Sequence, residues 1–268
     1  MAAGSAVRRE WQRFTPRQRI ARFAVYLFVV AALLASLRTV DIIPEFLADA
    51  PTQMADLLRR MWPIDFHEFE RGAGQAMLET INIASIGTLI TLLMAIPIGI
   101  MAARNITRVP VLNWIAQFLL VASRSVNSLV WALLFVAVFG PGALAGTVAI
   151  AFRSIGFVGK LFAESLEEAQ RGPIEALRAV GAPPLSILLQ GYWPQVKPAF
   201  WSLVLLRWDI NVRESAVLGL VGAGGIGVAL QTAMDFFQWN RVALILLLVF
   251  AVVIVAELAV NLIRRRLI

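Results

Sequence analysis

Long uncharged stretches alternate with short charged segments along this chain. Residues 23–37 and 80–103 contain no charged residue, and residues 198–220 and 242–263 are mainly apolar. A helix needs about 20 predominantly apolar residues to cross a bilayer, and the first stretch reaches that length with its flanking residues. The pattern predicts a membrane helix at each of these four places.

A fifth uncharged stretch, residues 125–152, is interrupted by Gly140-Pro141-Gly142. Such a triplet breaks a helix and turns the chain. We therefore expect one membrane helix before the triplet and another after it, and the second should continue past Arg153 and Lys160 into acidic residues.

Residues 111–122 mix apolar residues with Asn113 and Gln117 and are followed by Arg124. This mixture is typical of an interfacial helix that leads into a span. The chain is thus predicted to be an all-α, integral membrane helical bundle with about six transmembrane helices. Because six is even, both termini should lie on the same side.

The composition agrees with lipid as the solvent. Of the 268 residues, 59% are hydrophobic and 15% are charged, whereas about 25% of residues are charged in soluble domains. There is no cysteine, which excludes disulfides, thiolate nucleophiles and zinc–thiolate sites, and the single histidine, His67, stands among acidic residues and is given no role. No metal site is predicted.

The formal charge of +7 marks topology rather than nucleic-acid binding, because the basic residues form no continuous patch with interleaved aromatics. Clusters of arginine flank both ends of the apolar part, as the positive-inside rule expects for cytoplasmic segments. Residues 1–22 are therefore predicted to be a cytoplasmic basic N-terminus and residues 265–268 a cytoplasmic tail. The arginines concerned are Arg8, Arg9, Arg13, Arg17, Arg19 and Arg22 before the first span, and Arg264, Arg265 and Arg266 after the last.

The segment between the first two spans differs from the rest. Residues 38–75 contain three prolines and seven acidic residues against four arginines, which favours the external side. We expect residues 23–75 to hold the first span and this external connection, with one short surface helix. Residues 76–264 should form the transmembrane core.

Residues 172–195 are polar enough to lie outside the membrane and encode two short helices with a turn. Pro173 and Glu175 suit a first helical turn, Gly181 can end that helix, and Pro183 or Pro184 can open the next. From the residues alone, this pair could equally pack against the bundle or contact another protein.

The spacing of this segment resembles a known motif. Glu175-Ala176, Gly181 and Pro194 match the loop that permeases of ABC importers insert into a groove of their ATPase. Leu177, Gly191 and Trp193 stand where that motif has Ala, Ile and Leu, which departs from its residues but not from its spacing. The resemblance implies that Glu175, Ala176, Gly181 and Pro194 couple the chain to an ATPase.

A narrower resemblance covers residues 76–264, which look like the permease of phosphonate-type ABC importers, a type I importer fold. It rests on residues 175–182, Pro194-Gln195, residues 207–214 and residues 217–227. It implies transport of phosphonates, phosphite or phosphate by alternating access in the bacterial cytoplasmic (inner) membrane.

The partners that this resemblance implies are a second copy of the chain, two ATP-binding subunits that carry ATP and Mg, and a periplasmic or lipid-anchored solute-binding protein. Membrane lipid surrounds the chain, and no nucleic acid is involved. This chain itself holds no cofactor and does no covalent chemistry.

The predicted fifth helix carries four charges, and ionisable groups inside a membrane usually face one another or a polar pathway. At 100° per residue, Arg207, Asn211 and Glu214 share one face, whereas Asp209 and Arg213 share another and can pair. Pairing to hold the bundle and lining an anion route are equally open readings.

Our hypothesis combines the two. Asp209 and Arg213 form a structural ion pair, while Arg207 and Asn211 contact the passing oxyanion, since arginine offers a fork to phosphoryl oxygens. Glu214 belongs to the same pathway face. Arg124 is a further candidate, although an interfacial arginine that extends to the surface is the commoner case.

Residues 222–227 fit the dinucleotide-binding pattern G-x-G-x-x-G, but they follow a charged membrane helix instead of a strand. We interpret Gly222, Gly224, Gly225 and Gly227 as pathway glycines that allow close backbone approach. The chain also lacks a P-loop, because Ser154 and Leu161 break the required pattern around Lys160.

Two alternatives remain at this stage. One is a permease of the same fold for another small solute such as an amino acid. The other is a membrane enzyme acting on phospholipid head groups, for which the intramembrane acids would have to bind a metal ion.

Overall fold

The computed structural model describes residues 14–39 and 44–267, and every regular element within them is helical. Four helices are long and apolar enough to cross a membrane, or up to six if each of two bent pairs forms one span. The prediction of an all-α membrane bundle with about six spans is confirmed. The predictions for residues 1–13 and 40–43 lie outside the described residues.

The first 56 residues form a unit of their own, with α1 (Pro16–Thr39) and most of α2 (Pro44–Arg60). α1 begins before the predicted start at residue 23, so Arg17, Arg19 and Arg22 lie within it. None of its residues is buried. α2 occupies the predicted surface helix and is amphipathic. Its exposed apolar side chains are Phe46, Leu47, Met54 and Leu58.

The rest of the chain packs around α6 (Ala143–Glu167), the most buried span. α3 (Gly74–Ala102) lies along α6, and α9 (Trp193–Leu218) packs against both. α11 (Trp239–Leu267) packs on α9. Small residues bring these helices together, as is usual where lipid supplies no hydrophobic drive. A Cβ on Gly87 of α3 would lie 3.0 Å from Ile150 Cγ2 of α6.

The segment before α3 is tied to the far end of the chain. A π-helical turn, η1 (Phe69–Ala73), leads into α3, which begins six residues before the predicted residue 80. Glu68, which is 7% exposed, forms an ion pair with Arg241 in α11. The end of the segment that was predicted to be external is therefore fixed to the bundle.

The prediction that residues 125–139 form a span by themselves is wrong. α5 (Ser128–Phe139) has 12 residues and is bent by 94° from α4 (Pro110–Ser125), and 12 residues reach only about 18 Å. The side chain of Asn127 accepts a hydrogen bond from the Leu129 N–H and so starts a new helix. An uncharged run does not reveal such a break.

α4 is also placed differently from the interfacial helix that we predicted, because it packs against α3 and α6. Its two polar side chains serve the bundle. The amide of Asn113 donates to the Ala102 carbonyl at 2.6 Å, and Gln117 donates to Asn113 Oδ1 at 3.0 Å. They bind the free carbonyls at the end of α3, which a membrane bundle has to satisfy internally.

A glycine-rich turn joins α9 to α10 (Ile226–Asp235), a helix that the sequence analysis did not predict, through the short η3 (Gly219–Val221). Gly222, Gly224 and Gly225 have φ between +73° and +82°, a region that favours glycine. A Cβ on Gly227 would lie 2.2 Å from the Ala216 carbonyl oxygen. We call this end of the bundle the glycine end.

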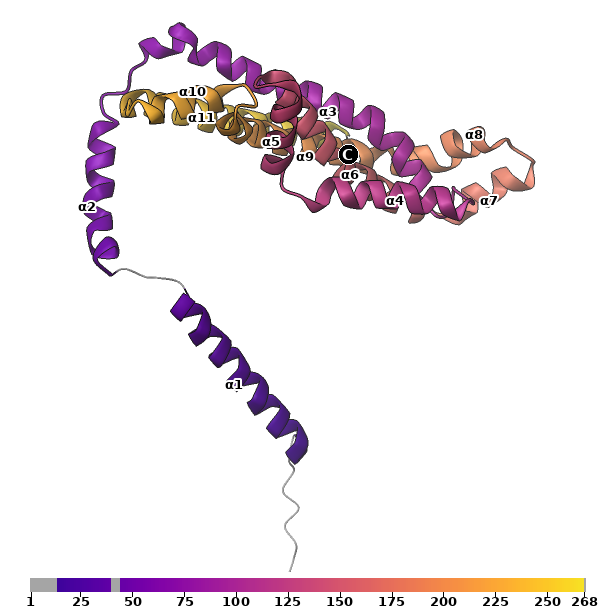
Figure 1. The fold of residues 1–268 in the computed structure, drawn as a ribbon. Helices are drawn as coiled ribbons and strands as arrows, with labels where there is room; N and C mark the ends of the chain where they lie inside the picture. Colours follow the sequence, from indigo (N-terminus) through magenta and orange to yellow (C-terminus); the bar gives the residue numbers. More distant parts are fainter. Residues whose placement is uncertain (1–13, 40–43, 268) are drawn as a thin grey trace, which may run out of the picture. The chain divides into compact units, whose positions relative to one another are not determined.

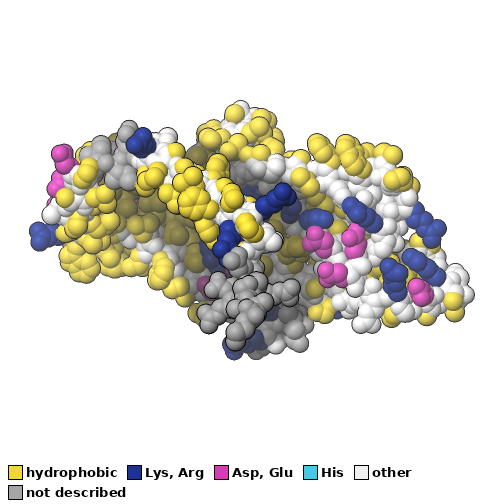
Figure 2. Space-filling view, turned by 90° about the horizontal axis from the view of Figure 1, so that it is seen from below, with side chains coloured by type: hydrophobic (Ala, Val, Ile, Leu, Met, Phe, Trp, Pro, Cys, Tyr) yellow, Lys and Arg dark blue, Asp and Glu magenta, His cyan; other side chains and the backbone are white. Residues whose placement is uncertain are grey.

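The opposite end carries a short hairpin, residues 171–192, which consists of α7 (Arg171–Ala179), α8 (Pro184–Ser186) and the π-helical η2 (Ile187–Tyr192). Figure 1 shows α7 and α8 at one end of the bundle and α10 toward the other. The face drawn in Figure 2 is largely apolar, and a group of acidic and basic side chains lies toward α7 and α8. We call this end the hairpin end.

A Cβ on Gly219 would lie 2.5 Å from Gly227 Cα, so the close contact of these two glycines should be important for stability. Gly227→Ala forces a Cβ against backbone atoms that cannot move independently, and overpacking typically costs about 1–3 kcal/mol or more. We expect a lower yield of monodisperse protein after detergent extraction and a lower thermal midpoint. Gly172→Ala, where a Cβ meets nothing within 4 Å, is the matched control. Equal behaviour of the two variants would contradict the close-contact role.

Candidate functional site

Arg207, which is buried, and Glu214, which is partly exposed, form an ion pair midway along the bundle. Arg207 is 3% exposed, its Nη2 lies 3.2 Å from Glu214 Oε2, and its Nε donates to Ser154 Oγ of α6 at 2.8 Å. Its guanidinium also lies 5.5 Å from the ring centre of Phe157. The predicted shared face of Arg207 and Glu214 is thus turned toward α6.

Arg153, which the sequence analysis did not single out as a site residue, faces the same carboxylate. Its Nε lies 4.0 Å from Glu214 Oε1, and its side chain is 27% exposed. The two oxygens of Glu214 therefore face two different arginines. The signal was present in the sequence, because Arg153 is the only charged residue between Ala143 and Gly159. We call Arg153, Arg207 and Glu214 the charged seam.

Asn211 shares the face of Arg207 but lies deeper. It is fully buried, its Oδ1 accepts from Ser154 Oγ at 3.1 Å, and its Nδ2 donates to Thr88 Oγ1 of α3 at 2.8 Å. The amide thereby joins three helices. The hypothesis that it contacts a solute stays a prediction.

Asp209 and Arg213 lie on another face of α9 and form an ion pair with each other. Asp209 is 8% exposed and Arg213 is 48% exposed, so the carboxylate depends on this arginine for its charge balance. The pair contributes no net charge. The separation of the four charges between residues 207 and 214 onto two faces of α9 is as the helical spacing predicted.

Arg124 lies at the end of α4 next to the middle of α6. A Cβ on Gly156 would lie 3.1 Å from Arg124 Cβ, so this arginine is level with the bundle's centre instead of its rim. It is exposed, and the described residues provide no ion pair or side-chain hydrogen bond to it. An exposed arginine at this depth is costly against lipid.

The half-exposed face of α6 continues from the seam toward the hairpin end. Arg153, Phe157, Lys160 and Glu164 follow one another at helical spacing, and Lys160 Nζ lies 3.2 Å from Glu164 Oε1. We call these four residues the polar stripe. The charged seam carries a formal charge of +1. Arg124, which lies against Gly156 three residues after Arg153 on α6, adds another positive charge.

The hairpin is built around the residues that matched the coupling motif. Gly181 has φ +76°, and the Ala182 N–H donates to the Leu177 carbonyl at 3.0 Å, which is a glycine-dependent end of α7. Glu175 and Ala176 are exposed. Pro194, which has no N–H to donate, lies in the first turn of α9, just after η2.

Two departures from the motif compensate each other. A Cβ on Gly191 would lie 3.2 Å from Leu177 Cδ1, so the larger side chain at 177 occupies the space that a side chain at 191 would need. The hairpin therefore keeps its packing although two motif positions differ.

The base of the hairpin is closed by Gln195. Its Oε1 accepts from the Gln170 N–H at 2.8 Å, and its Nε2 donates to the Gly191 carbonyl at 2.7 Å. Tyr192 and Ile174 are buried beneath it. The hairpin is thus attached rigidly to the start of α9.

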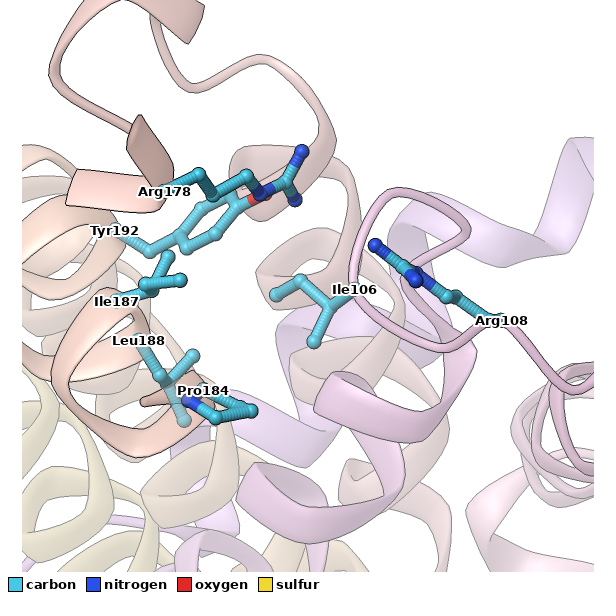
Figure 3. A pocket seen from close by; sticks show the side chains of 7 residues that line it. All are labelled: Ile106, Arg108, Arg178, Pro184, Ile187, Leu188 and Tyr192. Atoms are coloured by element: carbon cyan, nitrogen blue, oxygen red, sulfur yellow. The ribbon is translucent and has the colours of Figure 1, made fainter. Parts of the chain in front are cut away.

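The hairpin exposes apolar side chains and borders a pocket. Val180, Leu185 and Leu189 are 79%, 65% and 54% exposed. A pocket of about 420 Å³ separates the hairpin from the loop between α3 and α4, with Arg178 and Arg108 extending from its two sides and Ile106 between them (Figure 3). Its other lining residues are Pro184, Ile187, Leu188 and Tyr192.

At the glycine end, a hollow of about 460 Å³ is lined by Gly222, Gly224 and Gly225. Glu79 of α3 also lines it. Gly227 lies behind them against α9. Three of the four predicted pathway glycines therefore reach a surface hollow, and the fourth serves helix contact.

Two chemical alternatives find no support in this geometry. The G-x-G-x-x-G run is a turn between two helices, whereas a dinucleotide site needs a preceding strand. No three His, Asp or Glu side chains gather as metal ligands within the described residues, and Asp209 and Glu214 belong to separate ion pairs.

Comparison with known proteins gives relatives that are named as transport permease proteins. The chain is 39% identical over 204 residues to the phosphite transport system permease protein PtxC of Stutzerimonas stutzeri, covering 76% of this chain and 74% of the relative. It is 36% identical to the phosphate-import permease protein PhnE of Mycolicibacterium smegmatis over 94% of this chain, which spans only 47% of that longer relative.

Solved structures agree on the fold. The MetNI methionine ABC transporter in an inward-facing form matches 76% of this chain and 100% of its own with a TM-score of 0.65 at 21% identity. An amino acid ABC transporter matches with a TM-score of 0.63 at 18% identity. Identities this low establish the type I importer permease fold alone.

A family model described as binding-protein-dependent transport system inner membrane component matches residues 95–268. These residues include α6, α9 and the hairpin. The chain belongs to this family of membrane permease subunits of ABC importers.

Proposed function

We propose that this chain is the permease subunit of an ATP-driven importer of small tetrahedral oxyanions such as phosphonates, phosphite or phosphate. The observation that carries the proposal is the excess of positive charge midway along the bundle, where the charged seam is joined by the unpaired Arg124. Charged side chains in a membrane interior are expensive and usually mark a solute pathway. The names of the relatives from Stutzerimonas stutzeri and Mycolicibacterium smegmatis agree with this class of solute.

In this proposal Arg207, Glu214 and Arg124 line the pathway, and Asn211 holds α9 in place beside it and meets the solute when the helices separate. Arginine suits the task because its planar fork binds pairs of phosphoryl oxygens. Asp209 and Arg213 balance each other and stabilise α9. Gly222, Gly224 and Gly225 form the outer mouth of the pathway.

The hairpin end is assigned to the cytoplasm, together with both termini. Arg104, Arg108, Arg171 and Arg178 gather there, as the positive-inside rule requires. Two ATP-binding subunits, which carry ATP and Mg, would dock on the exposed apolar side chains of the hairpin. A second copy of the chain completes the pathway, and a solute-binding protein delivers the oxyanion at the glycine end.

Alternating access follows from how the hairpin is attached. Gln195 fixes the hairpin to the first turn of α9, and α9 carries Arg207 and Glu214 further along. When the ATPase subunits close, the hairpin and α9 move together relative to α6, which opens and closes the seam. Closure of the ATPase subunits is thereby linked to the charged side chains that meet the solute.

An amino acid permease of the same fold is the second candidate, since the solved neighbours are of that kind. The fold does not separate the two. The seam favours an anion, because an amino acid at neutral pH also carries an ammonium group, and Glu214 already has two arginine partners.

The size compensation between Leu177 and Gly191 can be tested by substituting first one residue and then both. Gly191→Ile should displace Leu177 and lower co-purification of the ATPase subunits severalfold, because the added side chain enters occupied space. Leu177→Ala combined with Gly191→Ile should restore co-purification, measured by pull-down from detergent extracts. A double variant as defective as the single one would contradict the packing argument.

The role of the Asp209–Arg213 pair predicts a second rescue. Arg213→Gln leaves a nearly buried carboxylate unpaired, which should cost roughly 1–3 kcal/mol and lower the thermal midpoint. Asp209→Asn with Arg213→Gln removes both charges and should recover most of the loss. Uptake that stays low in this stable double variant would instead place the pair in the pathway.

The proposed function itself is tested in vesicles that contain this chain, its ATPase and its solute-binding protein. We expect ATP-dependent accumulation of phosphate, phosphite or methylphosphonate, and no accumulation of methionine. Gly181→Val, which puts a β-branched residue at φ +76°, should abolish uptake while the bundle stays folded, whereas Gly172→Ala should transport normally. An intact, ATP-hydrolysing complex that accumulates none of the three oxyanions would refute the substrate class.

A further inference from the structure

We propose that Glu214 is an internal substitute for the transported anion, and that the oxyanion displaces it from Arg153. This inference rests on the proposed function and deepens it, because it names the arginine that binds the solute and the carboxylate that competes with the solute. Arg153 belongs to α6, and the sequence alone did not predict that it is part of a site.

The two arginines of the seam are held unequally. Arg207 is fixed by three partners, namely Ser154 Oγ at 2.8 Å, Glu214 Oε2 at 3.2 Å and the face of Phe157. Among the described residues, Arg153 has Glu214 Oε1 as its one charged partner, at 4.0 Å, which is beyond hydrogen-bond distance. Its Nε is buried and has no hydrogen-bond partner. Of the two, Arg153 is the arginine with donors left to offer.

Exposure points the same way. Arg207 is 3% exposed, whereas Arg153 is 27% exposed and stands at the head of the polar stripe. A solute that moves along this face of α6 meets Arg153 before it could reach Arg207. Lys160, held by Glu164 at 3.2 Å, repeats the arrangement of a basic residue with a carboxylate further toward the hairpin end.

The chemistry of Glu214 fits a substitute anion. A carboxylate presents two oxygens on one atom, and a phosphite or phosphonate group can present two of its three oxygens in the same way. Here each carboxylate oxygen of Glu214 faces one arginine. An oxyanion that takes the place of Oε1 gains the forked, charge-assisted bonds that Arg153 lacks in this state. Glu214 keeps its bond to Arg207 through Oε2, so neither charge is left alone.

The net charge of the seam also favours binding of an anion. Arg153 and Arg207 carry two positive charges and Glu214 one negative charge, so the seam accepts one more negative charge to become neutral. With Glu214 present, the bound anion competes with a resident carboxylate and is released again. Without Glu214, the two arginines would hold the anion.

The test uses the complete importer in vesicles with radiolabelled phosphate and methylphosphonate, whichever the wild type accumulates. Arg153→Gln should lower uptake roughly ten- to a hundredfold, the loss expected for a charge-assisted hydrogen-bond pair. Stimulation of ATP hydrolysis by the solute-binding protein should persist, and Arg153→Lys should recover only part of the uptake. Lys197→Gln, an exposed basic residue near the start of α9, is the matched control and should transport normally.

Retention of the anion separates a binding role from a structural one. Glu214→Gln should slow uptake yet leave labelled phosphate or methylphosphonate bound to the detergent-purified complex, which the wild type does not retain. Adding Arg153→Gln to Glu214→Gln should abolish that retention. A carboxylate that only held the helices together would give no retained anion, and that result would overturn the proposal.

Uptake by Arg153→Gln within twofold of the wild type would also overturn it while leaving the proposed function intact. A wild-type importer that accumulates no oxyanion would refute the proposed function first. If Arg153→Gln does not assemble, the retention measurement on Glu214→Gln still decides, because it leaves Arg153 in place.

Discussion

The absence of water around a membrane bundle is the constraint on which the rest of this structure depends. Every polar group between the two ends must find its partner inside the protein. The fully buried Asn211 meets this requirement by joining Ser154 of α6 and Thr88 of α3. The same Ser154 accepts from Arg207. The hydrogen-bonded group of Asn211, Ser154 and Thr88 therefore sets the spacing of three helices, and through Ser154 it also holds Arg207 in the charged seam.

The number and class of the spans could be predicted from the sequence because uncharged runs of about 20 residues have few other uses. The places where prediction went wrong are those where apolar character carries no information. Nothing in residues 125–139 shows that Asn127 starts a new, short helix at 94° to α4. Asn113 and Gln117 suggested an interface, but they bind one another and the carbonyls at the end of α3, a contact that only the fold creates.

The charged residues divide in a similar way. Partners on one helix, such as Asp209 and Arg213, follow from a spacing of four residues. Partners on different helices do not, and so the position of Arg153 opposite Glu214 could not be predicted. A single charge in the middle of α6 was visible, but its meaning depended on the rotation of α6 against α9. The compensation between the larger residue Leu177 and the smaller residue Gly191 could not be predicted for the same reason, because a motif compares each position separately.

The clamp formed by Gln195 has a mechanical consequence. Because it joins the base of the hairpin to the first turn of α9, a force on the hairpin is passed to α9 instead of being lost in a free loop. The opposite end of α9 is closely packed, since a Cβ on Gly225 would lie 2.6 Å from Thr80 Oγ1 and a Cβ on Gly219 would lie 2.5 Å from Gly227 Cα. A displacement of α9 is therefore greatest at the hairpin, smaller at Arg207 and Glu214, and smallest at this packed end. A large stroke outside the membrane becomes a fine adjustment of the seam, which is the scale on which hydrogen bonds to an anion are made and broken.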